Sequence, residues 1–311
     1  MSETEQWHLD RLNGIGGSEA SVILGINPWK SRLELWYEKV ERKIPTLNDN
    51  NNIRLNLGKV LEPLIAEEYT RKTGRGLVSR PQKTHDDYPF INGNVDREIV
   101  KSERQTHGIL EIKTKGAFVD WHDEEIPPYY IAQLQQYLAV YGYTWGSFAV
   151  LDFNSFEVTI TDVERDDTFI ENLINEEKKF WKLVTDKIPP EIEPTKSCEE
   201  FLREYFNQAE PITIDISDNT EATKFAEKLN HIKEHKKVLE ESETECKTYF
   251  MNLLQNAEKA TGDGYTISWK NDKDSTKFNM DTFKLENPQI YKKYLEPKKG
   301  SRRFLTKFQK E

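Results

Sequence analysis

The chain has 311 residues, of which 36 % are hydrophobic and 32 % are charged, and its formal net charge is −10. Its 15 Phe, 13 Tyr and 7 Trp supply enough large apolar side chains for a core, which excludes a chain that is disordered throughout. The acidic balance argues against a protein that coats nucleic acid without specificity, but it is compatible with an enzyme acting on DNA, because a site that holds metal ions is itself acidic.

Several other classes of protein are excluded by simple features. No run approaches the roughly 18 consecutive apolar residues of a membrane span, and Met1–Asp10 is too polar for a secretory signal. Two cysteines, Cys198 and Cys246, provide neither a disulfide framework nor a zinc or four-cysteine iron–sulfur site. We therefore expect no membrane association and a reducing, cytoplasmic location.

Helical patterns dominate the N-terminal third. Three helices are predicted, one that follows the glycine-rich turn at 12–21 and ends near Gly25, one from Ser31 to about Val40, and one from Leu57 to Thr73. The second begins with the capping pattern Ser-x-x-Glu, and the third stops at a glycine. The segment 45–53, which contains NDNNN, is expected to be a polar loop.

The middle of the chain alternates strands with helices. The predicted elements are a strand from Phe90 to Val100, a charged turn at 101–107, a strand from Ile109 to Thr114, a helix from Tyr129 to Tyr141, strands at 146–152 and 157–161, and a helix from Ile170 to Val184. The first two strands form a hairpin. We expect an α/β fold in which a mixed central sheet, with this hairpin at its centre, is flanked by helices.

A proline-rich linker at 189–194 separates a region of different character. Residues 221–257 are rich in Lys and Glu and predict one long helix or a helical pair, and 264–270 predict a short strand. The tail 272–311 is basic, with eleven Lys and Arg against six Asp and Glu. We predict two domains, 1–194 and a mainly helical extension at 195–311.

The hairpin carries the residues with the most informative chemistry. Alternate side chains of a strand share a face, so Glu111 and Lys113 point one way while Leu110 and Ile112 point into a core. Asp96 on the preceding strand can lie across from them. Two carboxylates at one position repel unless a cation neutralises them, and such oxygen ligands suit Mg²⁺ or Mn²⁺. The lysine fits hydrolysis of a phosphodiester, in which it can act on the attacking water or on the developing charge.

Each of these features also has an ordinary explanation. The pattern around Glu111 and Lys113 is, by itself, more often a solvated strand face. Glu62 on an amphipathic helix is more often a solvated charge, Gln133 can cap a neighbouring strand, and Arg11 can pair with an acidic neighbour in a GIGGS segment that is only a turn. The histidines His231 and His235 lie four apart on a highly charged helix and are expected to be solvated.

The order of these motifs resembles the lambda-exonuclease-like (YqaJ) branch of the PD-(D/E)XK nucleases. The segments that carry the resemblance are GIGGSEASVILGINPWKSRLELW, LGKVLEPLIAEEY, FINGNVD, GILEIKTK and PPYYIAQLQQYLAVYG, within residues 11–150. The resemblance implies a restriction-endonuclease-like core and a metal-dependent deoxyribonuclease that is encoded by a phage or prophage and acts in the cytoplasm of a bacterial host.

The resemblance also assigns roles. It implies that Asp96, Glu111 and the backbone carbonyl of Ile112 bind the catalytic metal, with Glu62 helping to hold a second. It assigns Lys113 to the attacking water and Gln133 to orienting that water or the lysine. A terminal-phosphate pocket falls on Arg11 and Ser18, and Asn94 stands where the family has a further serine.

The activity implied by the resemblance is processive 5′-to-3′ degradation of one strand of linear duplex DNA, which leaves single strand for recombination. It further implies binding of double-stranded DNA ends, a ring-shaped homo-oligomer, most simply a trimer, and a single-strand annealing protein as a partner. Arg302 and Arg303 in the basic tail are candidates for phosphate contacts. Two alternatives stay open: a structure-specific or single-strand endonuclease on the same fold, and an inactive scaffold for a recombination protein.

Overall fold

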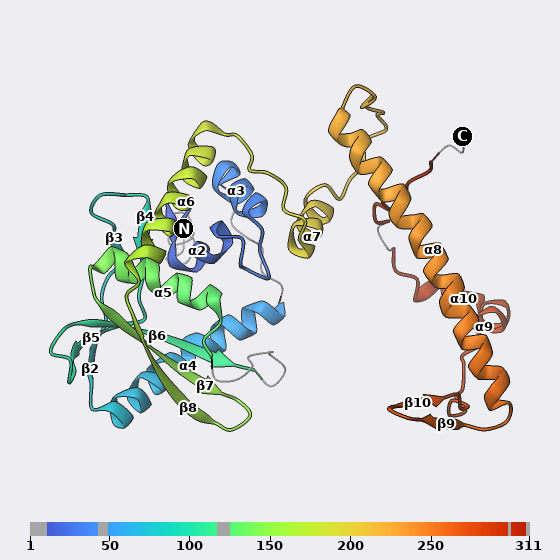
Figure 1. Ribbon diagram of the computed structural model, residues 1–311, viewed down its shortest axis with the longest axis horizontal. Helices are drawn as coiled ribbons and strands as arrows, with labels where there is room; N and C mark the ends of the chain where they lie inside the picture. Colours follow the sequence, from blue (N-terminus) through green and yellow to red (C-terminus); the bar gives the residue numbers. More distant parts are fainter. Residues whose placement is uncertain (1–10, 43–48, 117–124, 298–299, 309–311) are drawn as a thin grey trace. The chain divides into compact units, whose positions relative to one another are not determined.

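The computed structural model describes residues 11–42, 49–116, 125–297 and 300–308 (Figure 1). The chain divides into two compact units, Met1–Tyr205 and Phe206–Glu311. Throughout the described ranges, no helix combines the length and the apolar character that crossing a membrane requires.

The first unit is built on a five-stranded mixed sheet. Its strands, in spatial order, are β2 (Gly76–Val78), β5 (Arg97–Lys101), β6 (Gly108–Lys115), β7 (Trp145–Asp152) and β8 (Glu157–Glu164). All neighbours are antiparallel except β6 and β7, which are parallel and are connected through helix α5 (Pro128–Tyr141). A parallel pair requires such a crossover, since a tight hairpin can join only antiparallel strands.

Helices cover both faces of this sheet (Figure 1). On one face, α4 (Asp49–Thr73) packs Ile65 and Tyr69 against Leu110 and Ile112 of β6. On the other face, α5 and α6 (Asp167–Asp186) bury Leu134, Leu138 and Ile170 against Ile109 and Phe148. Alternate side chains of β6 therefore pack in two different cores, one on each face of the sheet. The predicted α/β architecture is confirmed.

A smaller sheet joins the N-terminal turn to the main body. It has the order β1-β4-β3, in which β1 (Ile15–Gly16) is parallel to β4 (Ile91–Gly93) and β3 (Lys83–Thr84) is antiparallel to it. Helices α2 (Gly17–Ile23) and α3 (Arg32–Glu41) follow β1 and pack Ile15, Leu35 and other apolar side chains against Phe180 of α6. The predicted cap of the second helix is confirmed, because Oγ of Ser31 accepts a hydrogen bond of 3.2 Å from the backbone nitrogen of Glu34.

The strand predicted from Phe90 to Val100 is in fact two strands in different sheets. Residues 91–93 form β4 beside β1, whereas 97–101 form β5 beside β6, and Asp96 lies in the break between them. Apolar side chains on both sides of Asp96 are buried but in different clusters, Val95 with Ile109 and Ile99 with Leu110. The register of the second half pairs Arg97 with Leu110 and Glu98 with Ile109.

Other boundaries also differ from the sequence prediction. Helix α4 begins at Asp49, so residues 49–53 of the expected loop are helical, while 45–48 lie outside the described residues. The short strands β2 and β3 and the helix α7 (Lys196–Tyr205) were not predicted. Helix α7 belongs to the first unit, where Phe201 and Tyr205 contact the ring of Tyr37 at centroid distances of 5.4 and 4.5 Å.

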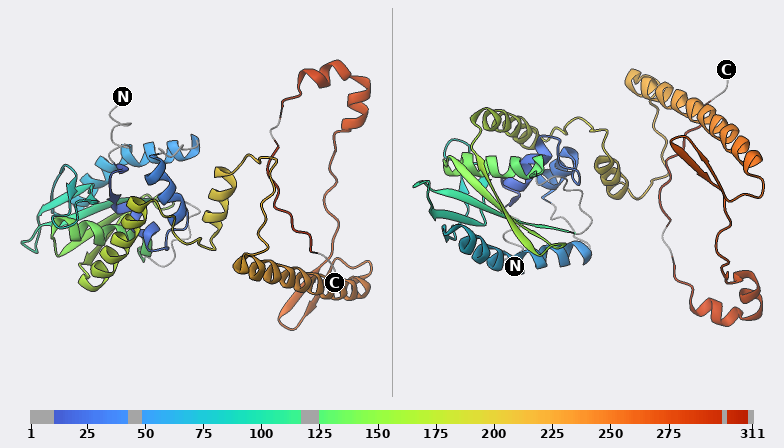
Figure 2. Two further views of the ribbon diagram at one scale, coloured as in Figure 1. Left: turned by 90° about the horizontal axis from the view of Figure 1, so that it is seen from above. Right: turned by 60° about the horizontal axis from the view of Figure 1, so that its bottom comes forward.

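The second unit is mainly helical, as predicted. Its principal element is the single helix α8 (Thr220–Leu254), which is followed by the hairpin β9 (Lys259–Gly262) and β10 (Tyr265–Ser268) and by the short helices α9 (Met280–Glu286) and α10 (Pro288–Lys293). The hairpin lies beside the helix, where Tyr265 contacts Phe250 at a ring distance of 6.4 Å (Figure 2). Among the described residues from 206 onward, only Leu254 is buried.

Candidate active site

A cavity of about 320 Å³ lies where the glycine-rich turn, the break before β5, strand β6 and helix α5 meet. It gathers eight of the predicted site residues: Arg11, Ser18, Asn94, Asp96, Glu111, Ile112, Lys113 and Gln133. Gly16, Gly17, Gln82, Asn92 and Tyr137 complete the lining. Residues separated by more than a hundred positions in the chain thus meet at one site.

The two carboxylates are brought together by the pairing of β5 and β6. Continuing the register by one residue beyond Arg97 and Leu110 places Asp96 opposite Glu111. Oδ2 of Asp96 accepts a hydrogen bond of 2.7 Å from the backbone nitrogen of Ile112. Because the side chain of Ile112 packs in the core beneath α4, it is the backbone of this residue that faces the cavity.

Lys113 and Gln133 form a closed hydrogen-bond network with Glu111. The lysine Nζ donates to Oε1 of Glu111 at 2.6 Å and to Oε1 of Gln133 at 3.1 Å. Nε2 of Gln133 donates to the same glutamate oxygen at 2.6 Å and to the hydroxyl of Tyr137 at 3.1 Å. Glu111 is only 2 % exposed, so it does not belong to a solvated strand face, and Gln133 binds the site rather than capping a strand.

The surroundings of these groups disfavour two negative charges. Burial, and then the charge of Glu111, raise the pKa of Asp96 to about 8. Burial also raises the pKa of Glu111, against the effect of Lys113. Burial lowers the pKa of the Lys113 ammonium, but the two carboxylates outweigh it and hold that pKa above its usual value. Both carboxylates are therefore costly to ionise together unless a further cation is present.

The donor set fits a hard divalent cation. Oε2 of Glu111 is buried and has no hydrogen-bond partner within the described part of the chain, and a buried polar atom without a partner is costly. Nowhere in the described ranges do three or more His, Cys, Asp or Glu side chains gather as metal ligands. The site therefore offers two carboxylates and backbone, and Mg²⁺ commonly takes so few protein ligands because it keeps several waters.

Glu62 lies outside the cavity lining. It projects from α4 and accepts a hydrogen bond from Nη1 of Arg97, the residue next to Asp96. It is nevertheless close enough to raise the pKa of both Asp96 and Glu111.

The opposite end of the cavity is formed by the glycine-rich turn. Nη2 of Arg11 donates to Oγ of Ser18 at 2.9 Å, and it also lies 3.4 Å from Oε1 of Glu19. The turn packs directly on α5, since a Cβ atom on Gly17 would lie 2.3 Å from Cε1 of Tyr137. Asn94 lines the same cavity from an exposed position.

A buried ion pair that was not predicted holds this turn in shape. Lys39 of α3 is 4 % exposed, and its Nζ donates to both carboxylate oxygens of Glu19 at 2.9 and 2.7 Å. The same nitrogen donates to the carbonyl oxygens of Arg11 at 2.8 Å and Gly14 at 2.7 Å. The available signal was the position of Lys39 on α3, where it shares the buried face with Leu35 and Trp36.

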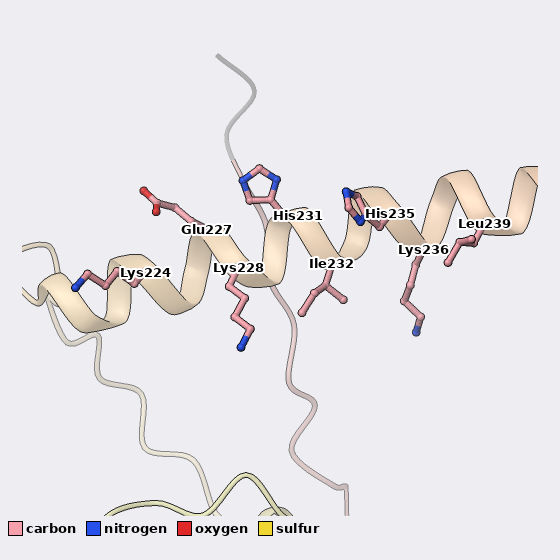
Figure 3. Close-up of a pocket in the computed structure, with 8 residues that line it drawn as sticks. All are labelled: Lys224, Glu227, Lys228, His231, Ile232, His235, Lys236 and Leu239. Atoms are coloured by element: carbon pink, nitrogen blue, oxygen red, sulfur yellow. The ribbon is translucent and has the colours of Figure 1, made fainter.

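A second hollow, of about 620 Å³, runs along α8 and is lined by side chains of that one helix (Figure 3). His231 and His235 both belong to it, together with four charged side chains. Nδ1 of His231 lies 3.8 Å from a carboxylate oxygen of Glu234, and both side chains are largely exposed. Arg302 and Arg303 also lie in the second unit and are exposed, and Nη1 of Arg302 donates to the carbonyl oxygen of Phe206 at 2.7 Å.

Comparison with known proteins finds similarity to recombination proteins and nucleases. A model of the YqaJ-like viral recombinase domain matches residues 6–144. The uncharacterized protein YqaJ of Bacillus subtilis (strain 168) is 32 % identical over 305 residues, which are 93 % of this chain and 90 % of that protein. An alkaline exonuclease of Laribacter hongkongensis is 22 % identical and covers 59 % of this chain and 94 % of its own, with a TM-score of 0.49. A phage-related exonuclease of Haemophilus somnus 129PT is 14 % identical and covers 56 % and 96 %, with a TM-score of 0.40.

Proposed function

Because the chain belongs to the YqaJ-like viral recombinase family, we propose that it is a magnesium-dependent DNA exonuclease in which Mn²⁺ can replace Mg²⁺. The observation that carries the proposal is Glu111. Its buried carboxylate faces Asp96, has one oxygen without a hydrogen-bond partner in the described chain, and is bound through the other oxygen to Lys113 and Gln133. A structural carboxylate pair explains neither the open oxygen nor the lysine.

The proposed mechanism divides the work among these residues. Asp96, Glu111 and the carbonyl of Ile112 hold the ion, which when bound supplies charge neutralisation and a more acidic water. Lys113 stands where its ammonium can orient the attacking water and stabilise the charge that develops on the phosphate, because it already lies 2.6 Å from the proposed ligand Glu111. Gln133 contacts both Lys113 and Glu111 and so fixes their separation. Glu62 helps to hold a second ion when one binds.

The turn end of the cavity is the proposed site for the terminal phosphate. Arg11 supplies a positive charge and Ser18 a hydroxyl, which already contact each other at 2.9 Å, and Asn94 adds an amide donor at the cavity edge. An arginine side chain with neighbouring donors suits the geometry of a phosphate. We propose a 5′-phosphorylated end of linear duplex DNA as the substrate, with processive 5′-to-3′ removal of one strand.

The biological setting follows from the same proposal. The product is single-stranded DNA for phage-type recombination in the cytoplasm of a bacterial host. A ring of identical subunits, a trimer in the first instance, would keep the enzyme on its substrate, and a single-strand annealing protein would receive the product. The second unit, with its long exposed helix α8, provides surface for such contacts.

The decisive assay uses linear duplexes that carry or lack a 5′-phosphate at either end, incubated with Mg²⁺, Mn²⁺ or EDTA. We expect short products released only from a 5′-phosphorylated end, and no product in EDTA. Covalently closed circular DNA is the control: cleavage of the circle would identify an endonuclease instead. Absence of cleavage of every DNA in both metals would contradict the proposal and favour an inactive scaffold.

A further inference from the structure

Three aromatic side chains form a continuous run outward from the candidate lysine. Nζ of Lys113 lies 4.6 Å from the centroid of the Tyr130 ring. That ring contacts Tyr129 edge to face at 4.5 Å. Tyr129 in turn contacts Trp29 at 5.0 Å, again edge to face. The indole of Trp29 therefore lies at most about 14 Å from the lysine nitrogen.

The outermost ring is exposed although its backbone is fixed. Trp29 is 63 % exposed. Its loop, between α2 and α3, is held by Asn27, whose Oδ1 accepts from the backbone nitrogens of Trp29 at 2.9 Å and Lys30 at 3.0 Å. The amide of Asn27 donates to Oγ of Ser21 at 3.0 Å. A large aromatic ring that a hydrogen-bonded loop holds out into water is available for a ligand to stack on.

The two tyrosines are equally well placed. They are the second and third residues of helix α5, after Pro128, and the backbone nitrogen of Tyr130 donates to the Pro127 carbonyl at 2.9 Å. The same helix carries Gln133 and Tyr137, so the aromatic run and the cavity share one support. An edge-to-face contact covers at most one face of each ring, so Tyr129 leaves one face of the indole uncovered.

We propose that Trp29, supported by Tyr129, is a stacking platform for an unpaired nucleobase of the DNA strand that enters the cavity. This inference rests on the proposed function. A strand of duplex DNA advances about 3.4 Å per nucleotide, so the indole is within reach of the first few nucleotides beside the phosphate that is cut. Every base has a π-face, so stacking binds all sequences alike, which suits an enzyme that must proceed through any sequence.

The platform adds a requirement to the reaction. A base that remains paired and stacked in the duplex cannot offer its face to Trp29. Binding to the indole therefore compensates for opening the terminal base pairs, and the opened strand is the form that reaches Asp96 and Glu111. Trp29 would therefore let the enzyme use ends that are fully paired.

The first test measures binding without hydrolysis. Wild-type protein and the variants Trp29→Ala, Trp29→Phe and Phe156→Ala are titrated in EDTA with short single strands that carry 2-aminopurine near a 5′-phosphate. Phe156 is the control, because it is a 77 % exposed aromatic side chain on the turn between β7 and β8. Stacking is worth roughly 1–3 kcal/mol per base, or about five- to 150-fold in affinity. We expect a loss of this size, with loss of 2-aminopurine quenching, for Trp29→Ala only, and rescue by Trp29→Phe.

The second test asks whether the platform opens ends. Rates of degradation are compared on duplexes whose terminal three pairs are matched or mismatched, with circular dichroism to confirm that each variant is folded. Trp29→Ala should be slower than wild type on matched ends, and mismatches should restore most of its rate. Equal slowing on both substrates, or wild-type affinity and quenching in Trp29→Ala, would overturn the platform. Quenching that depends on Trp29 in a protein without nuclease activity would support the platform while contradicting the proposed function.

Discussion

At the scale of single residues, the candidate site depends on the environment of Glu111. Its position two residues before Lys113 predicted that both side chains share a face of β6. The structure adds that Glu111 is buried and bound to Gln133 from α5. Sequence periodicity cannot supply that burial, because it comes from a helix that follows the strand and folds back over it.

Replacement of Lys113 by alanine should abolish most nuclease activity without unfolding the protein. Removal of a group that acts in the transition state commonly costs about 10²–10⁴ in rate, and we expect a loss of that size in kcat on 5′-phosphorylated linear duplex. Lys115→Ala is the matched control, since Lys115 lies on the same strand but pairs with Asp152 at 3.5 Å. Equal activity of Lys113→Ala and Lys115→Ala would refute the assignment.

The raised pKa of Asp96 predicts how stability depends on pH in the metal-free protein. The folded protein holds this proton to about pH 8, whereas the unfolded chain releases it near pH 4. Between these values the folded state binds more protons, so the free energy of unfolding falls as pH rises. Asp96→Asn should reduce this fall. It should raise the melting temperature at pH 8 by about a few degrees and have little effect at pH 4.

Thermal unfolding of both proteins in EDTA from pH 4 to 8 provides the measurement, with Asp87→Asn as the control for loss of an exposed carboxylate. Added Mg²⁺ should stabilise the wild type more at pH 8 than at pH 5, because the ion binds the ionised carboxylates. If Asp96→Asn and the wild type had the same melting temperature at every pH, Asp96 would not be the group that makes stability fall as pH rises.

At the scale of elements, local patterns predicted the helices and strands that surround the site but not how the chain changes sheets. The capping residue Ser31 and the proline pair before α5 marked real helix starts. The prediction of a single strand from Phe90 to Val100 overlooked the break at Asp96, although the turn-forming sequence Asn92-Gly93-Asn94 stands at the end of β4. Short strands such as β3, with two residues, have no periodicity to detect.

The buried contact between Lys39 and Glu19 could not be predicted for a similar reason. A lysine on the apolar face of α3 gives no indication of its partner, which lies 20 residues earlier in the first turn of α2. The contact links several elements, because the ammonium of Lys39 on α3 binds Glu19 at the start of α2 and the carbonyl groups of Arg11 and Gly14. It keeps Arg11 and Ser18 in place.

Loss of this ammonium should affect end recognition more than chemistry. In Lys39→Met the carboxylate of Glu19 loses its partner and can draw Arg11 away from Ser18. We expect the preference for 5′-phosphorylated over unphosphorylated ends to fall about tenfold or more, mainly through KM, with kcat at saturating DNA much less changed.

Lys30→Ala is the control, because Lys30, in the loop before α3, pairs with Glu38 of α3 rather than with Glu19. Lys39→Arg should recover part of the preference, which a purely structural defect would not predict. A variant Lys39→Met that is folded and retains the full preference for a 5′-phosphate would exclude this positioning role.

At the scale of the whole molecule, the two units differ in how they are stabilised. The first contains all four hydrophobic clusters of buried side chains that the described residues form. The second contains one buried residue, Leu254, in its described part and exposes many large apolar side chains, among them Phe225, Leu239 and Trp269. Such a unit gains stability when a partner covers this surface.

The exposed arginines of this unit should contribute to DNA binding through charge. The double variant Arg302→Ala/Arg303→Ala is expected to weaken binding of duplex DNA. It should also reduce the slope of log K against log salt concentration by up to about two, because each phosphate contact contributes about 0.9. Lys179→Ala/Lys182→Ala removes two exposed charges from α6 and serves as the control. An unchanged slope in the arginine variant would reject the contact.

The short parallel pair of β1 and β4 has a consequence for the size of the product. One strand of the pair leads directly into α2, whose second residue is Ser18, and the other ends three residues before Asp96. Two hydrogen-bonded strands thus hold the proposed phosphate site at a constant distance from the proposed metal ligands. If this distance is fixed, each round of cleavage would remove the same number of nucleotides, whatever the sequence or length of the DNA. The length of the products would then depend on the protein backbone. It would stay the same in side-chain variants that only slow the reaction.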